Sequence, residues 1–211
     1  GDTKVVEKGK GDQIFINTSG IGTIHPKGNI HFSRVEPGDQ IIVSGNIATH
    51  GVAIMSRRKG LEFETDIESD TNALNHLVKK LLDKEGESIH FMRDPTRGGV
   101  ATVLNEVAGQ AKVGVKLIQK NIPVNEQVEG ACELLGLDPL YIANEGIFLA
   151  IVEKSKASQA LEIFRSDPLG ENATIIGEVV DQHPRQVVLS SAVGGKRVVN
   201  YLTGEQLPRI C

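Results

Sequence analysis

The chain has 211 residues, a net charge of −4 and a pI near 5.9, so it is long enough for one large domain or one and a half smaller ones. The acidic balance argues against a nucleic-acid-binding protein, and the 4% aromatic content without Trp argues against base stacking. With two Cys residues, no signal peptide and no bilayer-length apolar stretch, we expect a cytoplasmic protein with reduced thiols.

The first 35 residues are predicted to be β-structured. A short strand over residues 12–17 precedes turn-forming segments at residues 19–22 and 25–29. Pro37-Gly38-Asp39 then introduces the apolar run 41–43, which is typical of a buried strand. A helix is predicted to begin at His50.

Two amphipathic helices come next. Leu74, Leu77, Val78, Leu81 and Leu82 form one apolar stripe, with Asp70 or Thr71 as the predicted N-cap and Gly86 at the end. A second stripe runs through residues 100–111. The remaining predicted elements are a helix over 128–135, a strand over 148–152, a helix capped by Ser155 that runs to Arg165, and strands over 173–180 and 186–189. Helices and strands thus alternate, which indicates an α/β or α+β layered fold.

The segment Asp94-Pro95-Thr96-Arg97-Gly98-Gly99 stands directly before the second stripe. A helix N-terminus carries free N–H groups and the positive end of the helix dipole, which together favour an anion. Arg97 adds a charge, and the glycines let the backbone approach a ligand closely. The alternative is a simple cap, with Asp94 or Thr96 as N-cap and the glycines forming a tight turn. The spacing is not that of a Walker A loop.

Two other places carry groups suited to catalysis. Glu145, between Asn144 and Gly146 and before a buried strand, is either a base in a cleft or a solvated turn residue. Asp2 and Lys4 fall on one face of an apparent strand, as a surface ion pair or as partners of a phosphate with a divalent metal. The six His residues lack the spacing of metal ligands.

The chain ends on Leu207-Pro208-Arg209-Ile210-Cys211. A terminal thiol is accessible and can carry a covalent group, and Pro208 stiffens its approach. The alternative is a frayed end without function. Prenylation is disfavoured because its motif requires three residues after the Cys. Cys132 lies in an apolar helical run, where we expect a buried, inert thiol.

These motifs, in this order, resemble the HypE family of hydrogenase maturation factors, within the aminoimidazole ribonucleotide synthetase-like (PurM) superfamily of ATP-using enzymes. The resemblance covers essentially the whole chain. It rests on residues 1–6, 15–18, 20–22, 38–39, 43–45, 93–100, 132–138, 143–146, 175–180 and 208–211. The Asp-x-Thr-Arg-Gly-Gly loop is shared with superfamily relatives, whereas the Pro-Arg-Ile-Cys ending is the specific mark. One departure lies at residues 48–51, where relatives often carry an Asp before the His.

The resemblance implies an α+β fold with α/β/α layers, like the PurM C-terminal domain. Residues 1–35 would be terminal strands of a truncated N-terminal ATP-binding domain, residues 36–200 the C-terminal α/β domain, and residues 201–211 a flexible tail with the reactive Cys. Family proteins are longer at the N-terminus, which agrees with the abrupt start at Gly1. Because the N-terminal domain carries most of the dimer interface, a homodimer is expected for the full-length protein.

The resemblance also implies the chemistry. A partner, HypF, places a carbamoyl group on the thiol of Cys211, and ATP with Mg²⁺ drives its dehydration to a thiocyanate. The cyano group then passes to iron in a HypC–HypD complex as a ligand of the nickel–iron hydrogenase centre. Phosphorylation turns the amide oxygen into a leaving group, and removal of two amide protons requires a base.

Site roles follow from the same resemblance. Cys211 would carry the substrate, Glu145 would be the base, and Lys4 would orient the oxygen or stabilise its charge. Asp2 would bind the metal. The predicted nucleotide-binding set is Asp2, Thr3, Asn17, Asp94, Thr96, Arg97, Gly98 and Gly99.

Two alternatives stay open. The chain could be a non-catalytic carrier and docking fragment that keeps the thiol arm and lacks the nucleotide site. It could also be another PurM-superfamily synthase acting on a free small molecule, which has no need of a terminal Cys. We expect little or no ATPase activity from this chain alone, because residues of the N-terminal domain are missing, and we expect no nucleic-acid or membrane partner.

Overall fold

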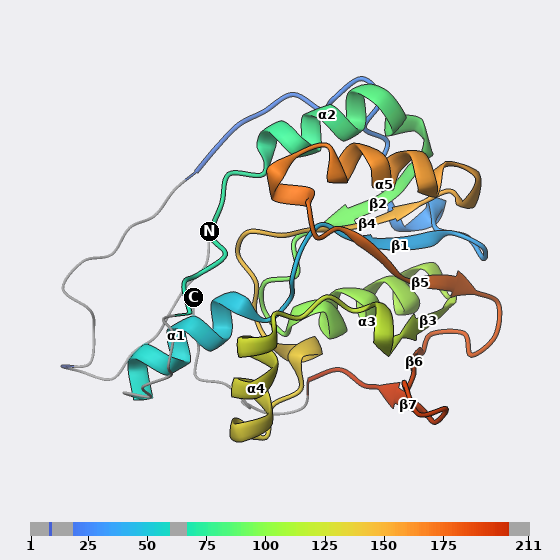
Figure 1. Ribbon diagram of the computed structural model, residues 1–211. Coiled ribbons are helices and arrows are strands. Elements are labelled where there is room, and N and C mark those ends of the chain that lie inside the picture. Colours follow the sequence, from blue (N-terminus) through green and yellow to red (C-terminus); the bar gives the residue numbers. More distant parts are fainter. Residues whose placement is uncertain (1–8, 10–18, 60–66, 203–211) are drawn as a thin grey trace.

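A computed structural model describes residue 9 and residues 19–59 and 67–202 of the chain (Figure 1). The strand predicted over residues 12–17, the Asp2–Lys4 segment and the tail with Cys211 lie outside the described residues. Residues 19–35, which were predicted to be β-structured, contain no strand; their one regular element is the 3-10 helix Phe32–Arg34.

A seven-stranded mixed sheet forms the centre of the described part, in the order β2-β4-β1-β5-β3-β6-β7. Neighbouring strands pair antiparallel except β3 and β6, which are parallel, with Val115 opposite Val187. The strands are β1 (Gln40–Val43), β2 (Ile89–Arg93), β3 (Gly114–Ile118), β4 (Leu149–Val152), β5 (Thr174–Val180), β6 (Val187–Ser190) and β7 (Lys196–Val199).

Helices cover both faces of this sheet, as Figure 1 shows. On one face lie α2 (Asn75–Glu85) and α5 (Ala157–Arg165). On the other lie α1 (Thr49–Lys59), α3 (Gly99–Ala111) and α4 (Glu126–Leu135). The predicted α+β fold with α/β/α layers is therefore confirmed. None of the helices in the described ranges is both long and apolar enough to cross a membrane.

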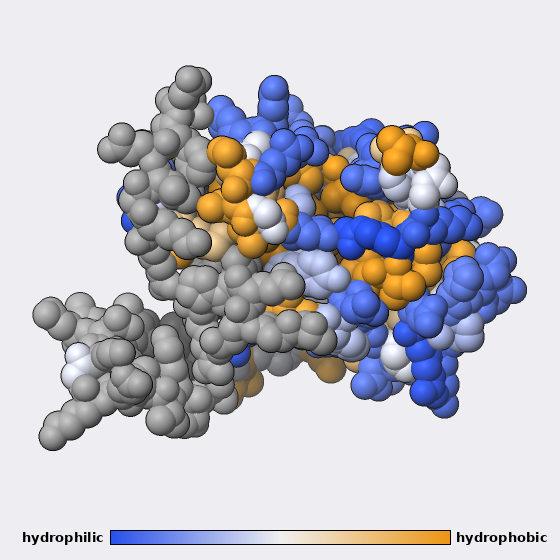
Figure 2. Space-filling view, turned by 90° about the horizontal axis from the view of Figure 1, so that it is seen from below, coloured by the Kyte–Doolittle hydropathy of each residue, from blue (hydrophilic) through white to orange (hydrophobic). Residues whose placement is uncertain are grey.

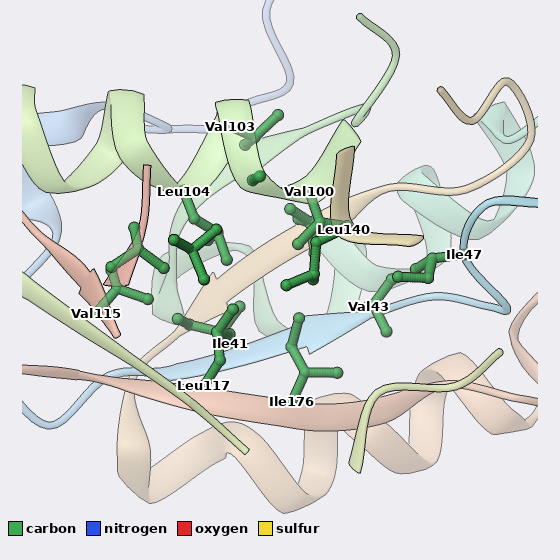
Figure 3. Close-up of a cluster of buried hydrophobic side chains, with 14 of the residues drawn as sticks. Ile41, Val43, Ile47, Val100, Val103, Leu104, Val115, Leu117, Leu140 and Ile176 are labelled. Atoms are coloured by element: carbon green, nitrogen blue, oxygen red, sulfur yellow. The ribbon is translucent and has the colours of Figure 1, made fainter. Parts of the chain in front are cut away.

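Strand β1 shows how one apolar run serves two cores. Ile41 and Val43 are fully buried in the cluster that includes α3, and Ile42 between them is buried in the cluster with α2 and α5. Successive side chains of a strand point to opposite faces, so a strand covered on both sides is apolar throughout. In Figure 3, side chains of α3 such as Leu104 lie over β1 and its neighbours.

Two predicted helix caps are wrong. Helix α2 begins at Asn75, after Leu74, which makes no side-chain cap. Asp70 and Thr71 lie too far before this start, and their side chains contact the N–H of Glu145 and the Ser69 hydroxyl. Helix α5 begins after the 3-10 helix Lys154–Lys156, and the Ser155 hydroxyl donates to the Glu153 carboxylate. In both places a polar group near a helix start finds a different partner.

Strands β2, β3 and β7 were not predicted. Strand β7 lies at the sheet edge with Lys196, Arg197 and Val198 exposed, so it lacks the apolar run that marks a buried strand. Charged edge residues of this kind discourage pairing with another chain. The face seen in Figure 2 is mixed, with apolar atoms in separate patches between hydrophilic ones.

Replacing Leu104 by Ala tests the core between α3 and the sheet. Leu104 is fully buried, so the truncation should lower the free energy of unfolding by about 2–5 kcal/mol. The matched control is Leu134→Ala on α4, where the side chain is 81% exposed and the change should stay within about 0.5 kcal/mol. Urea unfolding measures both, and equal effects would contradict the described packing.

Candidate functional site

The connection between β2 and α3 lines an open cavity of about 500 Å³. Its walls come from the end of β2, the loop that follows, the first two turns of α3 and the turn before β4. The lining residues are Arg93, Asp94, Thr96, Arg97, Thr102, Val103, Glu106 and Glu145. The fold thus gathers Asp94, Thr96, Arg97 and Glu145, which belong to two separate sequence motifs, around one space.

Two glycines shape the start of α3. Gly98 is the N-cap with φ of +69°, and Gly99 has φ of +61°. A Cβ on Gly98 would lie 2.1 Å from the Thr102 hydroxyl, and one on Gly99 would lie 2.5 Å from the carbonyl oxygen of Leu140. Neither Asp94 nor Thr96 caps the helix, since α3 has no side-chain cap. Gly98 and Gly99 do not line the cavity, and their contact with a nucleotide stays a prediction.

The side chain of Asn144 joins three loops behind the cavity. It is fully buried, and its Oδ1 accepts the N–H of Ala48 at 2.7 Å. Its Nδ2 donates to the carbonyl oxygens of Pro95 and Ile142, each at 2.9 Å. The connection after β1, the loop after β2 and the turn before β4 are therefore held in one arrangement.

Glu145 follows directly and is held through its backbone. Its N–H donates to the Asp70 carboxylate, at 3.2 Å to Oδ1 and 3.4 Å to Oδ2. A Cβ on the neighbouring Gly146 would lie 1.5 Å from the carbonyl oxygen of Asp70, so the two backbones touch and only glycine fits. The segment around Asp70 thus packs directly against the turn that presents Glu145.

Charge in the cavity is mixed. Arg93 forms an ion pair with Glu106, while Arg97 and Asp94 are exposed and Glu145 is half-buried. A guanidinium and threonine hydroxyls beside a helix N-terminus suit a phosphate group. A carboxylate on the same cavity can accept a proton from a bound group.

The predicted residues Asp2, Thr3, Lys4, Asn17 and Cys211 lie outside the described residues. The cavity carboxylates do not converge on a cation: within the described ranges, the one group of three possible metal ligands is Glu36, Asp39 and His90. That group lies at the other end of β1 and β2, where His90 Nδ1 contacts Asp39 Oδ2 directly at 2.7 Å. The described residues therefore do not by themselves form a Mg²⁺ site at the cavity.

The sequence did not predict the place of four residues in the site. Arg93, Thr102 and Glu106 line the cavity, and Asp70 supports Glu145. Thr102 and Glu106 stand four positions apart on α3, off its apolar stripe, and this spacing was the available signal. Arg93 falls in the motif 93–100, which gave it no role of its own, and nothing local marks the role of Asp70, because its partner Glu145 is 75 positions away.

A second cavity, of about 260 Å³, lies beside α4 and includes Cys132 in its wall. The thiol is 1% exposed, which confirms the predicted buried state. Burial, followed by the nearby Asp138 and Glu129 carboxylates, raises the pKa of Cys132 to about 11. A thiol in this state is a poor nucleophile, so Cys132 does not make this cavity a nucleophilic site.

Comparison with known proteins gives concordant matches. Residues 36–190 match the family of the AIR synthase related protein, C-terminal domain. The carbamoyl dehydratase HypE of Azotobacter vinelandii is 51% identical over 211 residues, which is 100% of this chain and 62% of that protein.

Solved structures agree with this match. A crystal structure of hydrogenase maturation protein HypE in complex with ATP has a TM-score of 0.81 and 44% identity, covering 86% of this chain and 55% of that one. A HypE–HypF complex has a TM-score of 0.78 and 43% identity, covering 82% of this chain and 56% of that one. The chain thus spans less than two thirds of the proteins it resembles.

Replacing Asn144 by Ala should destabilise the fold. The change removes the partner of the Ala48 N–H and of the Ile142 carbonyl, whereas the Pro95 carbonyl keeps the backbone N–H of residue 144. The expected cost is about 2–3 kcal/mol in the free energy of unfolding. Asn172→Ala, at an exposed position, is the control and should change it by less than about 0.5 kcal/mol. Urea unfolding that gave equal values would argue against the Asn144 contacts.

Cys132 should react slowly with iodoacetamide. With its pKa raised to about 11, only about 0.1% of the thiol is ionised at pH 8, against roughly a fifth of an ordinary cysteine. We expect alkylation at least about 100-fold slower than that of glutathione in the same tube. Peptide mapping by mass spectrometry follows Cys132 separately, and labelling at the glutathione rate would refute the buried environment.

Proposed function

The chain belongs to the AIR synthase related family, and on this basis we propose that it acts in nickel–iron hydrogenase maturation, in the ATP-dependent dehydration of an S-carbamoyl group to a thiocyanate. The proposal concerns the longer protein, because the chain spans 62% of its Azotobacter vinelandii relative. Support comes from that relative's name, carbamoyl dehydratase HypE, and from the similar HypE structures with ATP and with HypF.

One observation carries the proposal: Glu145 shares a cavity with Thr96 and Arg97. Dehydration of an amide needs a phosphoryl group near the amide oxygen and a base near the amide nitrogen. A phosphate-type loop and a carboxylate on one cavity meet both needs. The 500 Å³ volume leaves space for the triphosphate end of a nucleotide together with a small amide.

In the proposed reaction, the carbonyl oxygen of the thiocarbamate on Cys211 takes the γ-phosphoryl group of ATP, and ADP is released. The C–O bond then breaks and phosphate leaves, while both protons of the NH₂ group are removed to form the C≡N bond. Thiocarbamate and ATP thus give thiocyanate, ADP, hydrogen phosphate, which keeps one of the two protons, and one released proton. In this scheme Glu145 accepts a proton from the amide nitrogen.

Other residues receive proposed roles that depend on parts of the chain outside the described ranges. Cys211 would carry the substrate, Lys4 would orient the amide oxygen, and Thr3 and Asn17 would contact the nucleotide beside Asp94 and Thr96. Asp2 would help to hold Mg²⁺, whose charge lowers repulsion between phosphate and nucleophile when it is bound.

The proposed partners follow the same scheme. HypF would donate the carbamoyl group, and a HypC–HypD complex would accept the cyano group. The full-length protein would be a cytoplasmic homodimer. A second proposal applies to this chain alone, which would act as a carrier and docking unit with little or no ATPase activity.

Glu145→Gln in the full-length protein tests the proposed base. HypF, carbamoyl phosphate and ATP load Cys211, and mass spectrometry then follows loss of water from the loaded thiol. We expect dehydration to slow by at least about 100-fold, the range that a general base contributes, with loading of Cys211 and ATP binding unchanged. Glu162→Gln, exposed on α5, is the control. Unchanged dehydration in Glu145→Gln would remove Glu145 as the base.

A further inference from the structure

Asp70 lies beside the candidate base without lining the cavity. We propose that Asp70 is a positioning residue, which fixes the main chain of Glu145 and thereby the place of its carboxylate. This inference rests on the proposed role of Glu145 as the base. It extends the site to a loop, residues 67–72, that no motif connected with the chemistry.

The contact is made between segments 75 positions apart in sequence. Both carboxylate oxygens of Asp70 face the N–H of Glu145, with Oδ1 the closer at 3.2 Å. One backbone N–H is thus shared between two acceptor oxygens, and the shorter distance is within the range of an ordinary hydrogen bond. On the next residue, Gly146 meets the Asp70 carbonyl so closely that a Cβ has no room. The turn is therefore held in place on both sides of Glu145.

The loop that carries Asp70 is itself tied down. Ser69 Oγ lies 2.8 Å from His50 Nδ1 on α1 and 2.7 Å from the Thr71 hydroxyl. The side chain of Asn72 donates to the Asp70 carbonyl oxygen at 3.0 Å. Asp70 thus transmits the position of α1 to the turn before β4. These polar contacts fix the position of the loop, and with it the position of the Asp70 carboxylate.

The position of the turn determines where the Glu145 carboxylate lies. The carboxylate of a glutamate lies several bonds away from the backbone, so a small rotation of the turn moves the carboxylate by more than the turn itself. A misplacement of about 1 Å at a reacting group can cost roughly 100-fold in rate. Loss of the Asp70 contact should therefore lower the rate of dehydration without changing how the nucleotide binds.

A double-mutant cycle with Glu145 tests this in the full-length, carbamoylated protein. We expect Asp70→Ala to lower kcat of dehydration by about 10- to 100-fold, with KM for ATP within about twofold of the unaltered protein. In the Glu145→Gln background the same change should lower the residual rate by less than about twofold, since effects of coupled residues are not additive. Asp181→Ala, at an exposed position, is the control and should leave kcat unchanged.

Asp70→Asn separates the hydrogen bond from the charge. The amide oxygen of Asn can still accept the Glu145 N–H, so this variant should keep kcat within about threefold of the unaltered protein. If Asp70→Ala does not fold, Ser69→Ala replaces it in the double-mutant cycle, and Asp70→Asn is still measured. Ser69→Ala removes the tie to His50 and should slow dehydration by about 2- to 10-fold in the unaltered background alone.

The outcomes distinguish the two proposals. Full activity of Glu145→Gln would overturn the proposed base whatever Asp70 does. An inactive Glu145→Gln with a fully active Asp70→Ala would overturn the positioning role alone. Equal losses from Asp70→Ala in both backgrounds, or a folded Asp70→Asn as slow as Asp70→Ala, would also overturn it, because a purely structural or purely electrostatic role gives those results.

Discussion

The arrangement of the site depends on one buried amide, the side chain of Asn144. It is fully buried, and a buried polar group is costly unless it is hydrogen-bonded. Its partners lie on the connection after β1, on the loop after β2 and on its own turn. Ala48 even adopts a positive φ of 72° at this junction, a conformation that costs a non-glycine residue energy. The positions of the three connections consequently depend on one another.

The sheet order explains why these connections can meet. Strands β2, β4 and β1 are neighbours, and Arg93, Leu149 and Val43 stand at the same end of the three strands. The loop after β2, the turn before β4 and the connection after β1 therefore leave the sheet side by side. Functional groups on such loops are held by the rigid strands beneath them. The cavity follows from strand order as much as from its own residues.

Sequence reasoning succeeded where the physical cause is local. Apolar periodicity predicted α2, α3 and the buried runs of β1 and β4, because burial on a regular element leaves a repeating pattern. It failed for β7, whose exposed edge residues carry no such pattern. The sequence predicts Asp70 or Thr71 as the cap of α2, because a carboxylate or hydroxyl near a helix start usually accepts a local N–H. The actual partner of Asp70, Glu145, is 75 positions away, and nothing in a single sequence indicates which backbone N–H the carboxylate accepts.

The support of Glu145 is internal to the described fold, and this bears on how the proposed reaction is organised. Asn144 and Asp70 both hold the turn through groups within residues 36–190, the range of the family match. A base held in this way is in place before a nucleotide or a loaded thiol arrives, so little reorganisation remains for the reaction itself. In the proposed scheme, the Glu145 carboxylate would keep its position while Cys211 brings the carbamoyl group to it.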